Sequence, residues 1–230
     1  CCMVPYTSYR ACTPNLAAGS LPITAQPAPE GYGEESYALP DSEPMGIEDI
    51  RDALIIREGS AFLLTDPDGN VAAGNTQGFG IYHADTRHLS AYDLTLNGHR
   101  PVMLLSTAEL GYAMEQVMTN PTFSLDEVRN VSRGSIEIRR QRVVADCVEE
   151  TLTVTNYNPF PITLNLLYEF GADFSDIFDV RGYKRERAGE LRKPIVDERS
   201  IRYSYVGIDD RERTTQVEFD RAPDYIDEAT

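Results

Sequence analysis

The feature of this sequence that most constrains its fold is a repeated alternation of apolar and polar residues with a period of two. Isoleucines alternate with charged residues over 136–139, and Leu and Val alternate with Thr over 151–155. This alternation is typical of strands with one buried face, because successive side chains of a strand point to opposite sides. The same pattern recurs at residues 92–96, 162–170, 201–205 and 215–219. No long amphipathic helix is visible beside it, so the sequence predicts an all-β fold.

Turn signals separate the predicted strands at the spacing of hairpins. The run 66–69 (Asp-Pro-Asp-Gly) follows an apolar segment, and Asn97-Gly98 is the dipeptide that a two-residue type I′ turn prefers. Many short strands at this spacing, over about 175 residues, indicate one antiparallel β-sandwich rather than an α/β fold. We therefore predict a single β-sandwich domain over residues 53–230.

Residues 1–52 differ from this patterned body in composition. Seven of the 14 prolines lie in residues 1–44, and no apolar period continues there for more than a few residues. Ordering a backbone costs of order 1–2 kcal/mol per residue, and this segment offers little apolar surface to offset that cost. The sequence therefore predicts a disordered, Pro-rich N-terminal leader over residues 1–52.

The chain is strongly acidic, with 37 Asp and Glu against 21 Lys and Arg and a formal net charge of −16. Such a surface repels phosphate groups, so we expect no nucleic-acid partner and no membrane partner. No apolar run approaches the roughly 20 residues of a membrane-spanning helix. The first residues lack the basic and apolar regions of a signal peptide. We therefore expect a cytoplasmic protein.

The four cysteines have the spacing of neither a disulfide framework nor a metal site. Cys1, Cys2 and Cys12 lie in the predicted leader, and Cys147 stands alone in the patterned body. The adjacent Cys1 and Cys2 lack the two-residue gap that lets two thiolates face one metal ion. We expect cytosolic thiols, no metal site and no cofactor.

Residues 83–88 (His-Ala-Asp-Thr-Arg-His) bring two of the three histidines next to a carboxylate. In an extended segment His83 and Asp85 point to one face and His88 to the other, which weakens a metal site. The alternative is the entry of a strand, where Asp85 caps a turn and Arg87 pairs with a carboxylate. We favour this structural interpretation over a cluster of metal ligands.

Residues 173–182 form the second polar block, with three carboxylates at three-residue intervals next to an arginine and two aromatic residues. Glycoside hydrolysis needs two carboxyl groups several ångströms apart, and a tight loop could bring Asp173 and Asp176 together. The alternative is a solvated acidic loop whose Phe174, Ile177 and Phe178 pack into the sandwich. We favour the structural interpretation here as well.

Arg139, Arg140 and Arg142 form a basic group within one predicted strand. A guanidinium group can bind a carboxylate or a phosphate through two parallel hydrogen bonds. In so acidic a protein, ion pairing across strands is the favoured role. The sequence contains no phosphate-binding loop, no serine-hydrolase nucleophile elbow and no His-Glu-x-x-His motif. Nucleotide binding, serine hydrolysis and zinc proteolysis therefore have no motif support.

Four blocks of this sequence together resemble the N-terminal domain of bacterial and archaeal glycogen debranching enzymes, the amylo-alpha-1,6-glucosidase-like family. The blocks are residues 57–66, 80–90, 94–101 and 173–182, and the resemblance extends over roughly residues 54–187. The resemblance implies a β-sandwich that precedes an (α/α) barrel, in which the hydrolytic carboxylates of these glycoside hydrolases lie. The chain would then be a truncated product, an excised domain or a stand-alone relative of the accessory domain.

By this resemblance we expect a non-catalytic domain that packs on a downstream (α/α) barrel and helps to shape an α-glucan site. It implies no catalytic residue in this chain. The candidate residues for substrate binding or for the domain interface are Asp85, Arg87, Asp173, Asp176 and Arg181. The sequence has no Trp, so Tyr82, Tyr168 and Phe178 would have to supply aromatic faces for sugar rings.

Two other functions stay open at this point. The first alternative is a stand-alone β-sandwich module that binds a glycan or another protein. The second is an autonomous hydrolase that uses Asp173 and Asp176, and it predicts release of glucose by the purified chain.

Overall fold

The computed structural model describes residues 2–3, 7–12, 52–124, 130–183 and 189–226, the first two segments by their backbone alone. The described part of the chain consists of antiparallel strands and one helical turn, α1 (Ile177–Val180), which confirms the predicted all-β fold. Within this part, no helix is long and apolar enough to cross a membrane.

The strands follow one another along the chain with short connections. They are β1 (Cys2–Met3), β2 (Thr7–Cys12), β3 (Leu54–Glu58), β4 (Ala61–Thr65), β5 (Gly80–His83), β6 (Thr86–Leu89), β7 (Ala91–Leu96), β8 (Val102–Thr107), β9 (Ala113–Thr119), β10 (Phe123–Ser124), β11 (Asn130–Val131), β12 (Ile136–Val144), β13 (Cys147–Asn156), β14 (Leu166–Gly171), β15 (Glu190–Leu191), β16 (Ile195–Asp197), β17 (Ser200–Val206) and β18 (Glu212–Phe219).

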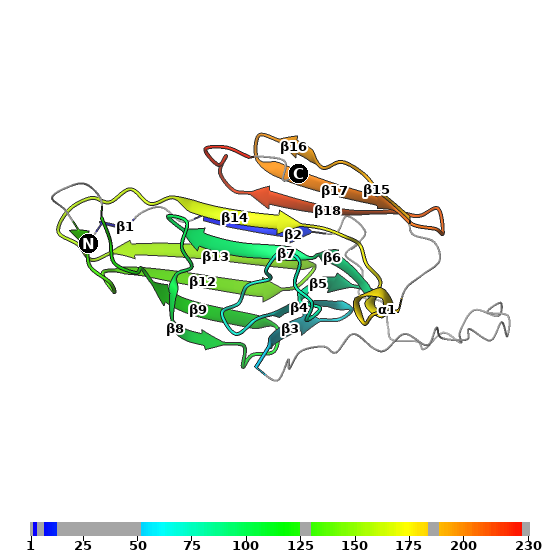
Figure 1. Ribbon diagram of the computed structural model, residues 1–230, viewed down its shortest axis with the longest axis horizontal. Helices are drawn as coiled ribbons and strands as arrows, with labels where there is room; N and C mark the ends of the chain where they lie inside the picture. The colour runs from blue at the N-terminus through cyan, green and yellow to red at the C-terminus, as the bar shows by residue number, and fades with distance from the viewer. Residues whose placement is uncertain (1, 4–6, 13–51, 125–129, 184–188, 227–230) are drawn as a thin grey trace.

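Ten of these strands form one large antiparallel sheet (Figure 1). Its main path runs β15–β17–β18–β2–β13–β12–β9–β8, with β1 paired to β13 and β16 paired to β17. The ladder between β12 and β13 runs from Ile136 opposite Asn156 to Val144 opposite Val148. These two strands are the segments with the clearest alternation in the sequence, since one face of each is buried.

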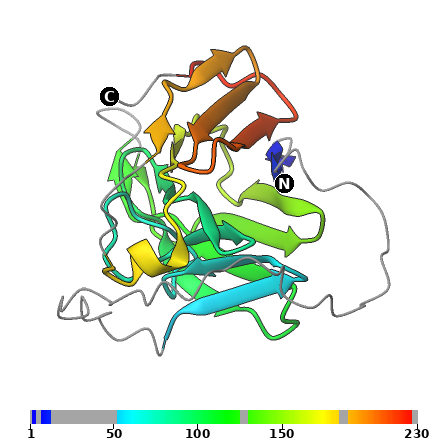
Figure 2. The same cartoon turned by 90° about the vertical axis from the view of Figure 1, so that its right-hand side faces the viewer.

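A second layer covers one face of the large sheet. It consists of the four-stranded sheet β3–β4–β5–β6 and the pair β14–β7, while β10 and β11 form a short separate pair. Figures 1 and 2 both place β3 and β4 on one side of the molecule and β15–β18 on the other. The predicted sandwich is therefore built from two unequal layers.

The predicted leader of residues 1–52 falls largely outside the described residues, because 13–51 lie outside them. Two of its segments are described, and both are strands. β1 pairs with β13, and β2 lies between β13 and β18 in the large sheet. The sequence did not predict these strands, because a backbone can pair with two free strand edges without any apolar period of its own.

Two buried apolar clusters fill the space between the layers. The first packs β3–β6 against the large sheet, including its strands β17 and β18, and contains Leu63, Val144 and Val217. The second joins β7 to β9, β12 and β13 and contains Leu94 and Ile138. Burial of these side chains is the main favourable contribution to folding, at roughly 25 cal/mol per Å² of apolar surface.

A polar layer separates the two apolar clusters along three strands of the large sheet. On each strand one or two polar residues lie between a residue of the first cluster and a residue of the second: Gln116 on β9, Arg140 and Arg142 on β12, and Glu150 on β13. All four side chains are buried, with at most 1% of their surface exposed. A layer of buried polar and charged side chains therefore separates the two apolar clusters of the core.

The predicted strand over residues 162–170 is shorter in the structure, where β14 begins at Leu166. Its partner β7 ends at Leu96, opposite Leu166. Beyond that point Asn165 bonds to Asn97, the residue that begins the turn after β7. Ile162 still packs against the second apolar cluster without being in a strand.

The Asn97-Gly98 turn forms as predicted, because both residues have positive φ, 50° and 76°. The hairpin around it is only one residue pair long, between Leu96 and His99. The next strand, β8, then crosses to the edge of the large sheet, while β7 stays in the second layer. The turn was predicted correctly, but its two flanking strands belong to different sheets.

Candidate functional site

The β5–β6 hairpin carries two of the predicted site residues. Its turn consists of Ala84 and Asp85, with φ angles of 45° and 64°. Residues 83–88 therefore form the end of a hairpin rather than one extended segment, and the ring centroids of His83 and His88 lie 6.0 Å apart. Among the described residues, no group of three or more His, Cys, Asp and Glu is arranged to hold a metal ion.

Arg87, on β6, forms a two-point ion pair with Asp173. Its Nε donates to Oδ1 at 3.2 Å and its Nη2 donates to Oδ2, while Nη1 donates to the carbonyl oxygen of Phe79 at 3.4 Å. Burial lowers the pKa of Arg87, but the hydrogen bond and charge of Asp173 outweigh burial and raise this pKa above that of an ordinary arginine. The ion pair that we favoured for Arg87 is therefore present.

Asp176 is the N-cap of α1. Its Oδ1 accepts a hydrogen bond from the backbone N–H of Phe178 at 2.9 Å, and Asp179 Oδ2 accepts one from the backbone N–H of Asp176 at 3.3 Å. This reciprocal arrangement satisfies two N–H groups that the start of a helix leaves without partners. Two of the carboxylates in the second polar block, Asp176 and Asp179, therefore have a structural role as helix caps.

Backbone hydrogen bonds dock this second block onto the tip of the β5–β6 hairpin, as α1 beside β5 and β6 in Figure 1. Ile177 N–H donates to the carbonyl oxygen of Asp85, and Arg87 N–H donates to that of Ser175, each at 2.8 Å. Asp85, Arg87, Asp173 and Asp176 thus lie in one region, although 86 residues separate Arg87 from Asp173.

Arg181 lies at the opposite end of the helical turn, as the C-cap of α1. Its backbone N–H donates to the carbonyl oxygen of Ile177 at 3.1 Å, and the residue is exposed. The location of all five candidates at an interface with another domain stays a prediction, since the structure contains this chain alone.

The aromatic candidates differ sharply in accessibility. Tyr82 is 2% exposed, donates to the carbonyl oxygen of Gly78 at 2.6 Å and stacks on Phe62. Tyr168 donates to Glu150 Oε1 at 2.5 Å inside the core. Phe178, on α1, is 54% exposed, contrary to the expectation that it packs into the sandwich. Of these three rings, only that of Phe178 offers a face to a sugar.

The carboxylates of this region do not form an acid–base pair. Both oxygens of Asp173 accept hydrogen bonds from Arg87, and Asp176 caps α1. Glycoside hydrolysis needs a carboxyl group that can give a proton to the leaving oxygen, and both oxygens of Asp173 are already held by Arg87. The arrangement is therefore suited to binding and positioning, and it gives no support to a hydrolase that uses Asp173 and Asp176.

A cleft of about 590 Å³ lies next to this region. It is lined by Glu58, Gly59, Ser60, Ala61, Tyr112, Val143, Val144, Ala145 and Asp146. Its wall is continuous with the β5–β6 turn, because Ala84 N–H donates to the carbonyl oxygen of Ser60 at 3.2 Å. Tyr112 is 49% exposed and contributes a second accessible ring.

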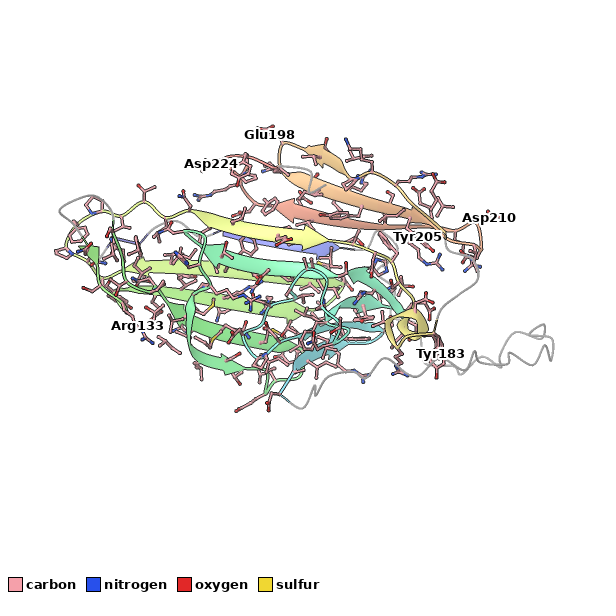
Figure 3. The ribbon with its side chains drawn as sticks, viewed as in Figure 1. Arg133, Tyr183, Glu198, Tyr205, Asp210 and Asp224 are labelled. Atoms are coloured by element: carbon pink, nitrogen blue, oxygen red, sulfur yellow. The ribbon has the colours of Figure 1, made fainter. Side chains whose placement is uncertain are left out.

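The turns that border the cleft gather at one end of the molecule. Tyr183, which follows α1, and Asp210, in the β17–β18 turn, lie toward this end, whereas Arg133 lies toward the opposite end (Figure 3). No sequence pattern pointed to Tyr112 or Asp146. Residues 58–60 were part of the family resemblance, but no pattern joined them to residues 143–146 on another strand pair.

His88 is the buried histidine behind this region, 6% exposed. Its Nδ1 lies 3.0 Å from Thr215 Oγ1, and its ring packs edge-on against Phe174. Burial, with smaller effects from the charges of His83 and Arg213, lowers the pKa of His88 to about 4. The imidazole is therefore neutral at pH 7 and packs as part of the core.

The comparisons with known proteins agree with the resemblance described above. The family model for the N-terminal domain of (some) glycogen debranching enzymes matches residues 56–230. The search of curated proteins gave no match. The matched range includes the second layer, the β5–β6 hairpin, α1 and the strands β7–β18.

Proposed function

We propose, from the premise that the chain belongs to the family of N-terminal domains of glycogen debranching enzymes, that it acts as a non-catalytic accessory domain. In this proposal the domain packs on an (α/α) barrel and helps to shape a binding site for an α-glucan. A cytoplasmic location belongs to the same proposal.

The observation that carries the proposal is that two polar blocks far apart in the sequence, residues 83–88 and 173–182, are held together at one end of the sandwich. The Arg87–Asp173 ion pair and the backbone hydrogen bond from Ile177 to Asp85 fix α1 against the β5–β6 hairpin. A rigid rim of this kind suits docking, because the partner need not order it on binding. Asp85, which is exposed, then lies on a preformed edge.

A sugar chain would use the cleft beside this rim. Carboxylates such as Glu58 and Asp146 can accept hydrogen bonds from sugar hydroxyls, and the rings of Tyr112 and Phe178 can pack on the apolar face of a pyranose. The volume of about 590 Å³ is within the range of small-ligand sites. The chemistry is that of binding without bond cleavage.

The first experiment titrates the purified chain with maltooligosaccharides by calorimetry and assays the same mixtures for glucose. We expect binding without release of glucose. Phe178→Ala and Asp85→Ala should each weaken binding about tenfold, which corresponds to about 1.4 kcal/mol. Arg133→Ala, at the opposite end of the molecule, is the matched control and should bind as the unchanged chain does. Glucose release would overturn the non-catalytic role.

The second experiment tests docking with a separately produced (α/α) barrel domain of a debranching enzyme. Alanine at Asp85 and at Asp176 should weaken the complex in a pull-down with purified components. If both variants retain glucan affinity and barrel docking at the level of the unchanged chain, the proposed interface is wrong. Glucan binding with no barrel docking would instead support a stand-alone glycan-binding module.

A further inference from the structure

The polar layer that divides the core contains a cluster of charged and aromatic side chains, which we call the Arg140 cluster. Its members are Arg140, Arg142, Glu150, Gln116, Tyr92 and Tyr168. Arg140, Arg142 and Glu150 are at most 1% exposed and lie between the two layers of the sandwich. No role proposed above uses this cluster.

Glu150 is the one carboxylate at the centre of the cluster. Its Oε2 accepts hydrogen bonds from Arg140 Nε at 2.6 Å and from the hydroxyl of Tyr92, and its Oε1 accepts one from the hydroxyl of Tyr168 at 2.5 Å. Arg142 Nε lies 3.6 Å from the same Oε2, beyond hydrogen-bond distance. The single carboxylate is thus occupied by three donors already.

Several donors of the two arginines remain without an acceptor. Arg140 Nη1 donates to Asn70 Oδ1 at 2.7 Å, and Arg142 Nη2 donates to Gln116 Oε1 at 2.7 Å. Arg140 Nη2 and the Nε and Nη1 of Arg142 are buried and have no hydrogen-bond partner among the described residues. Such groups are rare in native proteins, because each carries the full cost of leaving water.

The cluster also carries excess positive charge. Two guanidinium groups face one carboxylate, which leaves a net charge of +1. Burial lowers the pKa of Arg142 to about 10, so this group is still charged at pH 7. Burial raises the pKa of both tyrosines well above 10, so neither supplies a negative charge. Among the described residues, Glu150 is the one carboxylate in ion-pair distance of these two arginines, so the excess positive charge has no second counter-ion there.

The two guanidinium groups lie side by side. Both approach Glu150 Oε2, and both lie over the ring of Tyr92, at 4.7 Å and 5.3 Å from its centroid. The face of the Tyr92 ring stabilises the positive charge of both groups, but it does not serve as a hydrogen-bond acceptor for all of their N–H groups. The surroundings are tight, since a Cβ at Gly69 would lie 2.3 Å from Arg142 Nη2. In surroundings this crowded, a monatomic anion is a better candidate than a phosphate.

We propose that the Arg140 cluster binds one monatomic anion, chloride under ordinary conditions, through the N–H groups of Arg140 and Arg142 that lack a protein acceptor. Chloride accepts several N–H donors at once and brings the charge of the cluster to zero. The site is buried beneath the turn at residues 66–70, so the ion binds to the folded chain and not to the unfolded one. This proposal does not depend on glucan binding.

The test measures the stability of the full chain against chloride at constant ionic strength, with gluconate as the replacing anion. Above the dissociation constant, each tenfold increase in chloride should lower the unfolding equilibrium constant about tenfold. Arg142→Met removes one cation and should abolish this dependence. Arg139→Met is the matched control on the same strand, because Arg139 faces outward and pairs with Glu115, and it should keep the dependence.

A crystal grown with bromide supplies a second measurement that needs no variant to fold. We expect one anomalous peak within hydrogen-bond distance of Arg142 Nη1 and Arg140 Nη2. An ordered water at that position, with stability independent of chloride, would overturn the proposal. A bromide peak without any chloride dependence in solution would mean an adventitious ion only, and that result would also overturn it.

Discussion

At the scale of single residues, His88 gives the clearest dependence of stability on pH. The pKa of this imidazole is about 4 in the folded protein, against 6.5 for an unperturbed histidine. The folded state therefore binds fewer protons than the unfolded state between these values. The contribution of His88 is fully present above pH 6.5 and is lost as the pH falls toward 4, by about 3 kcal/mol in total.

We therefore predict that His88→Gln flattens the fall in unfolding free energy between about pH 6.5 and pH 4. Urea denaturation at a series of pH values measures this slope for both proteins. His99→Gln, at an exposed position, is the control and should keep the slope of the unchanged chain. Equal slopes for His88→Gln and the unchanged chain would contradict a neutral, buried imidazole.

Residue pairing was only partly predictable from the sequence. The position of Arg87 within a polar block predicted a carboxylate partner, but nothing local indicates that the partner is Asp173. The buried charges left a clearer signal. Arg140 and Arg142 share strand parity with Ile136 and Ile138, so alternation alone places them on the buried face. Because arginine is rarely buried in proteins, residue type alone would place these two side chains on the exposed face.

At the scale of elements, the turn at residues 66–70 connects the second layer to the Arg140 cluster. Gly69 has a φ of 76°, and its carbonyl oxygen accepts a hydrogen bond from Arg140 Nη1 at 3.2 Å. Gly98 has the same φ, but a Cβ there would meet nothing within 4 Å. Comparing alanine substitutions at these two glycines therefore distinguishes the free-energy cost of the backbone conformation from the cost of steric crowding.

We predict that Gly98→Ala costs only the left-handed conformation of a residue with a Cβ, about 1–2 kcal/mol. Gly69→Ala should cost a further 1–3 kcal/mol or so, because its Cβ displaces Arg142 and Gln116. Urea denaturation of both variants measures the difference. Equal costs at the two positions would show that the turn does not press on the cluster.

Strands were predicted well where one of their faces is buried. They were predicted less well where their position depends on which other strand they pair with. The alternation over 136–139 and 151–155 located β12 and β13, but it covered only the start of β12 and the end of β13. The hairpin expected at Asn97-Gly98 stops after one pair, because β8 pairs with β9 at the edge of the other sheet. Local turn chemistry fixes a reversal of the chain but not the layer into which the next strand goes.

At the scale of the whole molecule, β2 connects two parts of the large sheet that otherwise share no hydrogen bonds along its main path. Ala11 lies opposite Val148 on β13 and opposite Val217 on β18. This strand precedes the matched range of residues 56–230. The integrity of the sheet therefore depends on a segment outside the family match.

We predict that Ala11→Pro loosens β17 and β18 from the rest of the sheet, because proline lacks the N–H that a central strand needs. Trypsin should then cleave faster within residues 189–226, as measured by mass spectrometry, and stability should fall by about 1–3 kcal/mol. Ala11→Gly keeps the N–H and serves as the control. Cleavage at the same rate in both variants would contradict the bridging position of β2.

The fold class and the family followed from the sequence, whereas the arrangement of the two layers did not. Alternation predicts a buried face for each strand, but it does not tell which strands share a sheet. The candidate site was predictable as two polar blocks, and the cleft at Tyr112 was not, because three separate turns form it. Such assemblies depend on contacts between segments far apart in the chain.

The charged layer across the core also has a consequence for how the molecule opens. The apolar clusters on its two sides share few side chains, so the loss of one does not require the loss of the other. We expect amide hydrogen exchange to reveal two cooperative units, one around Leu63 and one around Ile138, with different opening free energies. The sandwich would then behave as two half-domains that are held together by one ionic seam.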